Sequence, residues 1–197
     1  RLRMAKAKKP LLDTAIQQVG VPKIPSPLPL CRFVGQNESI ELNLTEEEAD
    51  IEGVSNVPIA FEKAGPREKT YFDTSKVKCA IVTCGGLCPG INDVIRAIVM
   101  DAYHHYHVAS VIGIRYGLQG FIPRYGHDIV ELTPDNVSNI HEFGGTVLGS
   151  SRGPQPPDEV VDALERMNVS VLFMIGGDGT MKAAASIVKE IRARGSR

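Results

Sequence analysis

The feature that most constrains this chain is a repeated pattern of apolar strand, glycine-rich loop and amphipathic helix that starts near residue 77. The stretch AIVTCGGLCPGINDVIRAIV, residues 80–99, holds one such unit: an apolar run, a pair of glycines, a Pro-Gly pair and a helical pattern. Apolar strands that alternate with amphipathic helices are typical of a mainly parallel sheet with helices on both faces. We therefore expect an α/β fold for this part of the chain.

The expected elements follow from hydrophobic periodicity and from helix start and stop signals. Strands are expected at 77–84, 108–115, 129–132 and 169–176. Helices are expected after Asn92, from Thr133-Pro134 to Gly144-Gly145, at 159–167 and at 181–195. In the first helix Asn92 is the expected N-cap, and one apolar face is expected to contain Val94, Ile95, Ile98, Val99 and Ala102.

Glycine-rich loops follow three of these strands, at 85–90, 117–120 and 176–179. The carboxyl ends of parallel strands share one edge of a sheet, and ligands bind beyond that edge. Bare backbone N–H groups and helix N-termini favour anions there. The sequence therefore predicts a site for a phosphate group at this edge.

Two charged residues are candidates for the same site. Asp178, in GGDGT, places a carboxylate at the end of a strand, which suits a Mg²⁺ ion that arrives with a nucleotide. The alternative is that Asp178 only caps the helix at 181–195. Arg152, in the loop GGTVLGSSRG, is placed to clamp a phosphate, although such an arginine is often a plain surface charge.

Other features of the sequence argue against several classes of function. The net charge of −1 argues against nucleic acid or an acidic membrane as the main partner, and no apolar run approaches the length of a membrane span. The cysteines, at 31, 79, 84 and 88, lack zinc spacing, and Cys84 and Cys88 are expected to be small buried thiols. A metal site at HHYH, residues 104–107, is the weaker alternative to an ordinary helix end.

Residues 1–60 differ from the rest and are expected to form a proline-rich, partly disordered N-terminal extension. VPKIPSPLPL, residues 21–30, has the composition of an extended linker. The basic stretch RLRMAKAKKP, residues 1–10, is either an ordinary solvated tail or the remainder of an organelle-targeting peptide. TEEEAD, residues 45–50, predicts a short helix capped by Thr45.

Three segments together carry a resemblance to a known family. TCGGLCPGIN (83–92), GGTVLGSSRG (144–153) and GGDGT (176–180) occur in the order and spacing of the plant-type branch of ATP-dependent 6-phosphofructokinase. FEKAGPREKTYFD (61–73) also resembles the segment before that family's first strand. GGDGT alone is shared with NAD kinases and diacylglycerol kinases, whereas the upstream glycine loop discriminates between these families.

The resemblance implies that residues 61–197 form an incomplete N-terminal nucleotide-binding domain of the phosphofructokinase fold, with a Rossmann-like three-layer sheet. It implies phosphoryl transfer from ATP, with Mg²⁺, to fructose 6-phosphate, giving fructose 1,6-bisphosphate in glycolysis. The family also implies an allosteric homo-oligomer, a tetramer, in the cytoplasm or alternatively in a plastid.

The resemblance also assigns roles to individual residues. It places Gly86 against the ATP phosphates and Arg152 and Gly153 as nucleotide contacts. The phosphate and magnesium loop corresponds to Gly177, Asp178, Gly179 and Thr180, with Asp178 on Mg²⁺. Family members that use pyrophosphate carry an acidic residue at the position of Gly179, so glycine there implies ATP as donor.

Two departures from the family limit what the resemblance implies. The family's catalytic base lies in a Thr-Ile-Asp-Asn-Asp motif, which is expected beyond Arg197, so this chain alone is expected to be inactive and poorly soluble. Bacterial members bind an allosteric effector through several arginines, and only Arg96 matches them, because Met100 and Pro134 occupy two of the other positions. The alternative functions are an NAD-kinase-like or lipid-kinase-like GGDGT protein and a non-catalytic regulatory subunit.

Overall fold

A computed structural model describes residues 14–16, 18–29, 31–42 and 59–195 of the chain. The chain divides into two compact units, the first with residues 1–26 and 30–71 and the second with residues 27–29 and 72–197. The helix expected at 45–50 and the basic stretch 1–10 lie outside the described residues.

The first unit is built from two small antiparallel ribbons. These pair β1 (Ile24–Pro25) with β4 (Lys69–Thr70), and β2 (Ser39–Leu42) with β3 (Ile59–Glu62). The guanidinium of Arg67 fixes the end of the second ribbon, because it donates to the Glu62 carboxylate at 2.6 Å and to the Lys63 carbonyl at 2.7 Å. Because β3 pairs with β2, the second ribbon crosses the division expected at residue 60, and that division stays a prediction.

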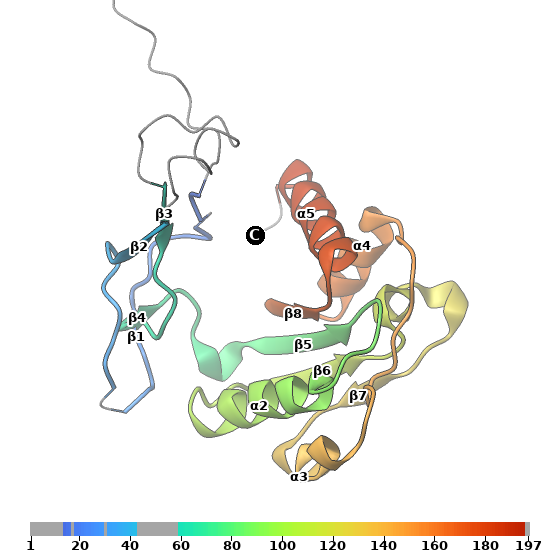
Figure 1. Ribbon diagram of the computed structural model, residues 1–197. Helices are drawn as coiled ribbons and strands as arrows, with labels where there is room; N and C mark the ends of the chain where they lie inside the picture. Colours follow the sequence, from blue (N-terminus) through green and yellow to red (C-terminus); the bar gives the residue numbers. More distant parts are fainter. Residues whose placement is uncertain (1–13, 17, 30, 43–58, 196–197) are drawn as a thin grey trace, which may run out of the picture. The chain divides into compact units, whose positions relative to one another are not determined.

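The second unit contains a four-stranded sheet with the order β7-β6-β5-β8 (Figure 1). Its three parallel strands are β5 (Lys78–Thr83), β6 (Ser110–Ile114) and β8 (Val171–Ile175), and β7 (Ile129–Glu131) runs antiparallel to β6. The expected mainly parallel sheet is therefore confirmed.

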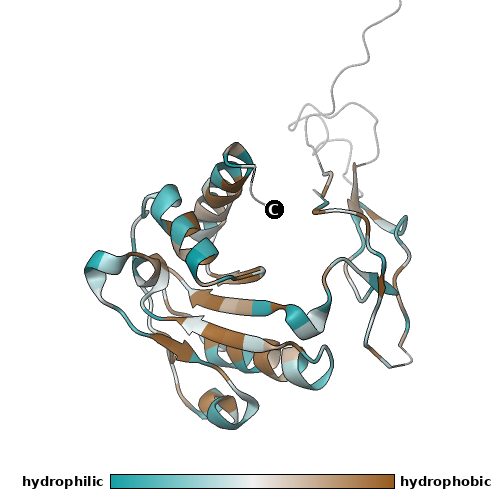
Figure 2. Cartoon of the chain, turned by 180° about the vertical axis from the view of Figure 1, so that it is seen from behind, coloured by the Kyte–Doolittle hydropathy of each residue, from teal (hydrophilic) through white to brown (hydrophobic). Residues whose placement is uncertain are grey.

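Helices cover both faces of this sheet, as the hydrophobic pattern predicts. One face carries α2 (Ile91–His104) and α3 (Pro134–Val137), and the other carries α4 (Pro157–Arg166) and α5 (Asp178–Ala193). Short 3₁₀ helices lie at Thr74–Lys76, Gly117–Phe121, Pro123–Tyr125 and Ile140–Glu142. Strand β5 serves both cores, because Cys79 and Ile81 face α2 while Ala80 and Val82 face α4 and α5. Figure 2 shows this sheet as largely hydrophobic.

Several local expectations are wrong, for tertiary reasons. Gly90, with φ of 86°, is the N-cap of α2, and the buried side chain of Asn92 instead bonds to a distant loop. Val94 is 45% exposed, so the apolar face is narrower than expected. The helix after Thr133 does have a capping box, but it ends at Val137, and a separate 3₁₀ turn follows.

Strand β8 also differs from its expected burial. All five of its residues are only partly buried, and β8, like β7, is an edge strand of the sheet in the part of the chain that the structure describes. An apolar groove of about 600 Å³ lies beside it and is lined by residues of β8, α4 and α5, among them Leu172, Met174 and Ile187. On α5, Met181 is 66% exposed and Val188 is 43% exposed along this groove. An open strand edge beside an apolar surface favours self-association.

We predict that the chain associates with itself through this groove. Val188→Lys places a charge on the groove and should shift the chain toward monomer, measured by size-exclusion chromatography with light scattering. Val94→Lys is the matched control, because Val94 has similar exposure on α2 and does not line the groove. A chain that is monomeric at every concentration, or that responds equally to both substitutions, would contradict this prediction.

The buried cysteines generate a prediction about alkaline pH. Burial raises the pKa of the Cys79 and Cys84 thiols from 9.0 to about 11. The folded chain therefore holds these protons to higher pH than the unfolded chain does, so their contribution to stability is complete below pH 9 and is lost as pH rises toward 11. The free energy of unfolding in urea should fall over this range.

Between pH 9 and pH 11, the free energy of unfolding should fall less steeply in a Cys79→Ala, Cys84→Ala double variant than in the unchanged chain. A Cys31→Ala, Cys88→Ala double variant is the control, because both of those thiols are exposed. Equal slopes in the two double variants between pH 9 and pH 11 would disprove the assignment.

Candidate functional site

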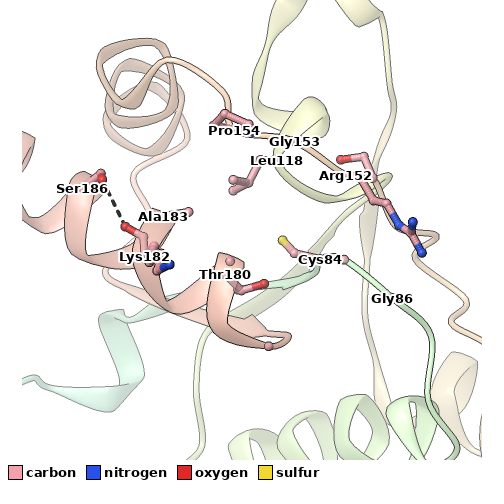
Figure 3. A pocket seen from close by; sticks show the side chains of 14 residues that line it. Cys84, Gly86, Leu118, Arg152, Gly153, Pro154, Thr180, Lys182, Ala183 and Ser186 are labelled. Carbon is pink, nitrogen blue, oxygen red and sulfur yellow. Dashed lines mark hydrogen bonds between the residues drawn. The ribbon is translucent and has the colours of Figure 1, made fainter.

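A cavity of about 530 Å³ lies at the carboxyl ends of the three parallel strands. It is lined by Cys84, Gly85, Gly86, Leu118, Ser151, Arg152, Gly153, Pro154, Gly177, Gly179, Thr180, Lys182, Ala183 and Ser186. These residues come from the loops after β5, β6 and β8, from the loop before α4 and from one side of α5 (Figure 3). The three glycine-rich loops therefore meet at one edge, as expected from the sequence.

The first wall of the cavity is the glycine loop, which we define as residues 85–90. It leaves β5 beside the end of β8, where the Cys84 N–H donates to the Ile175 carbonyl at 2.9 Å. Its first residue is bonded directly to another lining residue, because the Gly85 N–H donates to the Ser151 carbonyl at 3.1 Å. The loop then enters α2 at Gly90 with no side-chain cap.

The second wall is the start of α5, which follows β8 directly. A side chain at Gly176 is excluded, because its Cβ would lie 2.1 Å from the Thr180 hydroxyl and 2.8 Å from the Cys84 carbonyl oxygen. Gly177 is the N-cap of α5 and offers no side-chain hydrogen bond. The N–H groups of Asp178 and Gly179 donate to no acceptor among the described residues. Such a helix start is suited to bind an anion.

Asp178 itself is exposed on the first turn of α5. Its carboxylate makes no hydrogen bond or ion pair within the described part of the chain, so it does not cap the helix. It lies between two residues that line the cavity, Gly177 and Gly179, without lining it itself. The described residues contain no group of three His, Cys, Asp or Glu side chains that share a metal site. A single carboxylate fits Mg²⁺ when phosphate oxygens and water supply the other ligands.

The third wall is the arginine loop, which we define as residues 143–153. Arg152 is exposed and lines both the main cavity and a smaller neighbouring cavity of about 330 Å³. Its guanidinium forms no hydrogen bond or ion pair to another described residue. In Figure 3, Arg152 lies across the cavity from Thr180 and Lys182 of α5. A guanidinium without a protein partner is available to a phosphate or carboxylate.

The structure brings most of the predicted site residues together. Six of the seven line the main cavity: Gly86, Arg152, Gly153, Gly177, Gly179 and Thr180. The seventh, Asp178, lies beside it, between two of its lining residues. Their individual roles stay predictions.

Three residues of α5 that the sequence motifs did not indicate, Lys182, Ala183 and Ser186, extend the site beyond Gly179. Gly179, Lys182, Ala183 and Ser186 all line the cavity, and their spacing of three and four residues places them on one face of the helix. Lys182 thus adds a second cation on the side opposite Arg152. The sequence does contain a signal for these residues, because their spacing of three and four residues continues from the GGDGT motif along the following helix.

Other candidate features lie outside this cavity. The Nδ1 atom of His105 lies 2.6 Å from the Asp101 carboxylate on the surface, which accounts for one histidine of the HHYH stretch. Cys84 is buried as expected, but Cys88 is exposed. The Nε atom of Arg96 donates to the Ser138 carbonyl at 3.0 Å, so this arginine is used within the fold.

No helix in the described part of the chain combines the length and the apolar character that crossing a bilayer requires.

Comparison with known proteins agrees with the geometry. The family model for phosphofructokinase matches residues 78–194. The ATP-dependent 6-phosphofructokinase of Borreliella burgdorferi is 43% identical over 97% of this chain and 44% of its own length. The enzyme of the same name from Amycolatopsis methanolica is 53% identical over 69% of this chain and 29% of its own length. Arabidopsis thaliana ATP-dependent 6-phosphofructokinase 4, chloroplastic, is 40% identical over 83% of this chain and 29% of its own length.

Solved structures show the same fold. Phosphofructokinase of Pichia pastoris in the T-state matches with a TM-score of 0.52 and 26% identity, over 64% of this chain and 13% of that one. A pyrophosphate-dependent phosphofructokinase of Marinobacter aquaeolei matches with a TM-score of 0.55 and 16% identity, over 61% of this chain and 31% of that one. The chain spans less than half the length of each of these proteins. With more than half of its residues matched by the family model and homologous along almost its whole length, the chain belongs to the phosphofructokinase family.

Proposed function

We propose that this chain is the nucleotide-binding part of an ATP-dependent 6-phosphofructokinase, which transfers the γ-phosphoryl group of MgATP to fructose 6-phosphate. The observation that carries the proposal is the cavity at the carboxyl edge of the sheet, which gathers six of the seven residues that the family resemblance assigns to ATP. The names of the relatives support the same reaction.

The cavity has the chemistry that a Mg-nucleoside triphosphate requires. The start of α5, where the N–H groups of Asp178 and Gly179 have no acceptor among the described residues, is proposed to hold the phosphates. Asp178 is proposed to hold the Mg²⁺ ion, which enters as part of the substrate and neutralises charge on the phosphates. Arg152 is proposed to clamp the phosphates from the opposite wall, and Leu118 and Ala183 form an apolar surface suited to the base.

The choice of ATP over pyrophosphate is proposed to rest on Gly179. This residue lines the cavity, and a Cβ added there would have no heavy atom within 4 Å, so the protein itself leaves room for a side chain. An acidic side chain would project into that room and repel the nucleotide phosphates. The fold does not decide the donor, because the matched solved structures include a pyrophosphate-dependent protein.

The acceptor side of the reaction is proposed to need more than these 197 residues. The resemblance places the base in a Thr-Ile-Asp-Asn-Asp motif, which this sequence does not contain. We therefore propose that the chain alone binds MgATP without phosphorylating fructose 6-phosphate. The complete enzyme is proposed to be a homo-oligomer, a tetramer, in the cytoplasm, with a plastid as the alternative because one relative is named chloroplastic.

The test of the reaction is a chimera in which this chain replaces the matching segment of the Borreliella burgdorferi relative. We expect the chimera to form fructose 1,6-bisphosphate from ATP and fructose 6-phosphate in a coupled assay. Asp178→Asn should lower kcat by at least about a hundredfold, because it removes one of the charges that position the metal at the phosphates.

Asp162→Asn is the matched control, because Asp162 is an exposed carboxylate of α4 outside the cavity, and it should leave kcat unchanged. A folded chimera that binds MgATP but transfers no phosphoryl group would favour the non-catalytic subunit. A chimera that binds no nucleotide would contradict the proposal.

The donor assignment has its own test on the 197-residue chain. Gly179→Asp should weaken MgATP binding by at least about tenfold, because a carboxylate then faces the phosphates at close range in the cavity. Gly179→Ala adds volume without charge and should weaken binding far less. Binding is measured by equilibrium dialysis, and the melting temperature of each variant is compared with that of the unchanged chain. Equal losses for Ala and Asp would show that bulk rather than charge decides the donor.

A further inference from the structure

The arginine loop contains no helix or strand, so its shape depends on a small number of hydrogen bonds. Between the 3₁₀ turn that ends at Glu142 and the start of α4 at Pro157, the backbone is irregular. The guanidinium of Arg152 has no partner among the described residues that would hold it in place. The position of Arg152 therefore depends on what fixes the backbone of its loop.

A buried hydroxyl at the end of β5 provides one such attachment. Thr83 is 1% exposed, and its Oγ1 donates to the Gly149 carbonyl at 2.6 Å. The same Oγ1 lies 3.0 Å from the Thr146 hydroxyl. Because a carbonyl only accepts, the single proton of Thr83 is committed to Gly149, and Thr146 must be the donor to Thr83.

The relay continues within the loop. The Leu148 N–H donates to Thr146 Oγ1 at 3.2 Å, which satisfies the second hydroxyl as an acceptor. The Leu148 carbonyl in turn accepts from the Tyr116 N–H at 2.8 Å. The donor and acceptor of each of these hydrogen bonds are therefore defined. Together they fix the middle of the arginine loop to the end of β5 and to Tyr116, two residues beyond β6.

Further bonds hold the rest of the loop, among them the one from the Gly85 N–H to the Ser151 carbonyl at 3.1 Å. Asn92, 2% exposed, donates from Nδ2 to the Phe143 carbonyl and accepts from the Val147 N–H, both at 2.9 Å. The Ser150 hydroxyl donates to the Gly85 carbonyl at 2.7 Å. These bonds start from the glycine loop and from the first turn of α2, so the walls of the cavity are joined to each other directly.

Thr83 has a special place in this arrangement. It is the last residue of β5, with only Cys84 between it and the glycine loop, and it also holds the arginine loop. The side chain of Thr83 thus links the strand that leads into one wall to the loop that forms the other. We propose that Thr83 is a positioning residue that sets Arg152 against the glycine loop for nucleotide binding, an inference that rests on the proposed function.

The test measures MgATP dissociation constants of the full 197-residue chain by equilibrium dialysis. Thr83→Val keeps the shape and β-branching of threonine but removes both hydrogen bonds, and it should weaken MgATP binding about tenfold. Thr83→Ser restores the hydroxyl and should return the dissociation constant to within about threefold of the unchanged chain. A residue that served only the core would be expected to lose affinity in both variants or in neither.

A double-mutant cycle tests whether Thr83 acts through Arg152. In an Arg152→Ala background, Thr83→Val should weaken MgATP binding by no more than about twofold, because the group that Thr83 positions is absent. Val99→Ala is the control for stability alone, because Val99 is fully buried in α2 away from the cavity. It should lower the melting temperature without changing the dissociation constant.

Each outcome decides the proposal. Thr83→Val binding as tightly as the unchanged chain, or losing the same factor with and without Arg152, overturns it. If Thr83→Val does not fold, Thr146→Val removes one of the two Thr83 bonds from the loop side and leaves the bond to Gly149. It should then weaken MgATP binding by a smaller factor, and no loss, or an equal loss with and without Arg152, overturns the proposal. Absence of MgATP binding by the unchanged chain overturns the proposed function and this inference with it, whereas normal binding with an inert Thr83 overturns only the inference.

Discussion

The parallel pairing of β5 with β6 on one side and β8 on the other is the constraint on which the candidate site depends. Parallel strands bring their carboxyl ends to the same edge, so loops that lie about ninety residues apart in sequence surround one cavity. The backbone supplies most of this site, because helix starts and glycine loops present N–H groups without side chains in the way. Side chains then add only a few charges at fixed places.

The polar residues that join the loops are as important as the strands that carry them. Thr83 and Asn92 are buried among apolar side chains, where an unsatisfied polar group costs stability. Both are fully engaged with the arginine loop, so the same bonds that satisfy them also define the cavity wall. These bonds thereby fix the backbone from which the Arg152 side chain extends, although its guanidinium forms no ion pair with another described residue.

The sequence was sufficient for the strands and helices that have strong local signals, and for the gathering of the glycine loops at one edge. It failed where the deciding contact is distant. Asn92 has the composition of a helix cap, but its partners lie 51 and 55 residues away, which no local pattern reveals. Val94 fits the apolar face by spacing, yet the neighbouring elements bury only part of that face. β8 has the composition of a buried strand, but a strand is buried only when another element covers it.

Asp178, Arg152 and Lys182 give the site charges of both signs, which supports the proposed Mg-polyphosphate over a resident ion. Asp178 on α5 and Arg152 on the arginine loop carry opposite charges and bond neither to each other nor to other described residues. Exposed charges of opposite sign contribute little to the stability of the fold. A ligand that contacts both charges gives them a role in binding instead. A bare divalent ion would satisfy only the carboxylate, and a bare phosphate only the guanidinium. A ligand that brings a metal ion and phosphate oxygens together satisfies both at once, and the glycine loops leave room for it between them.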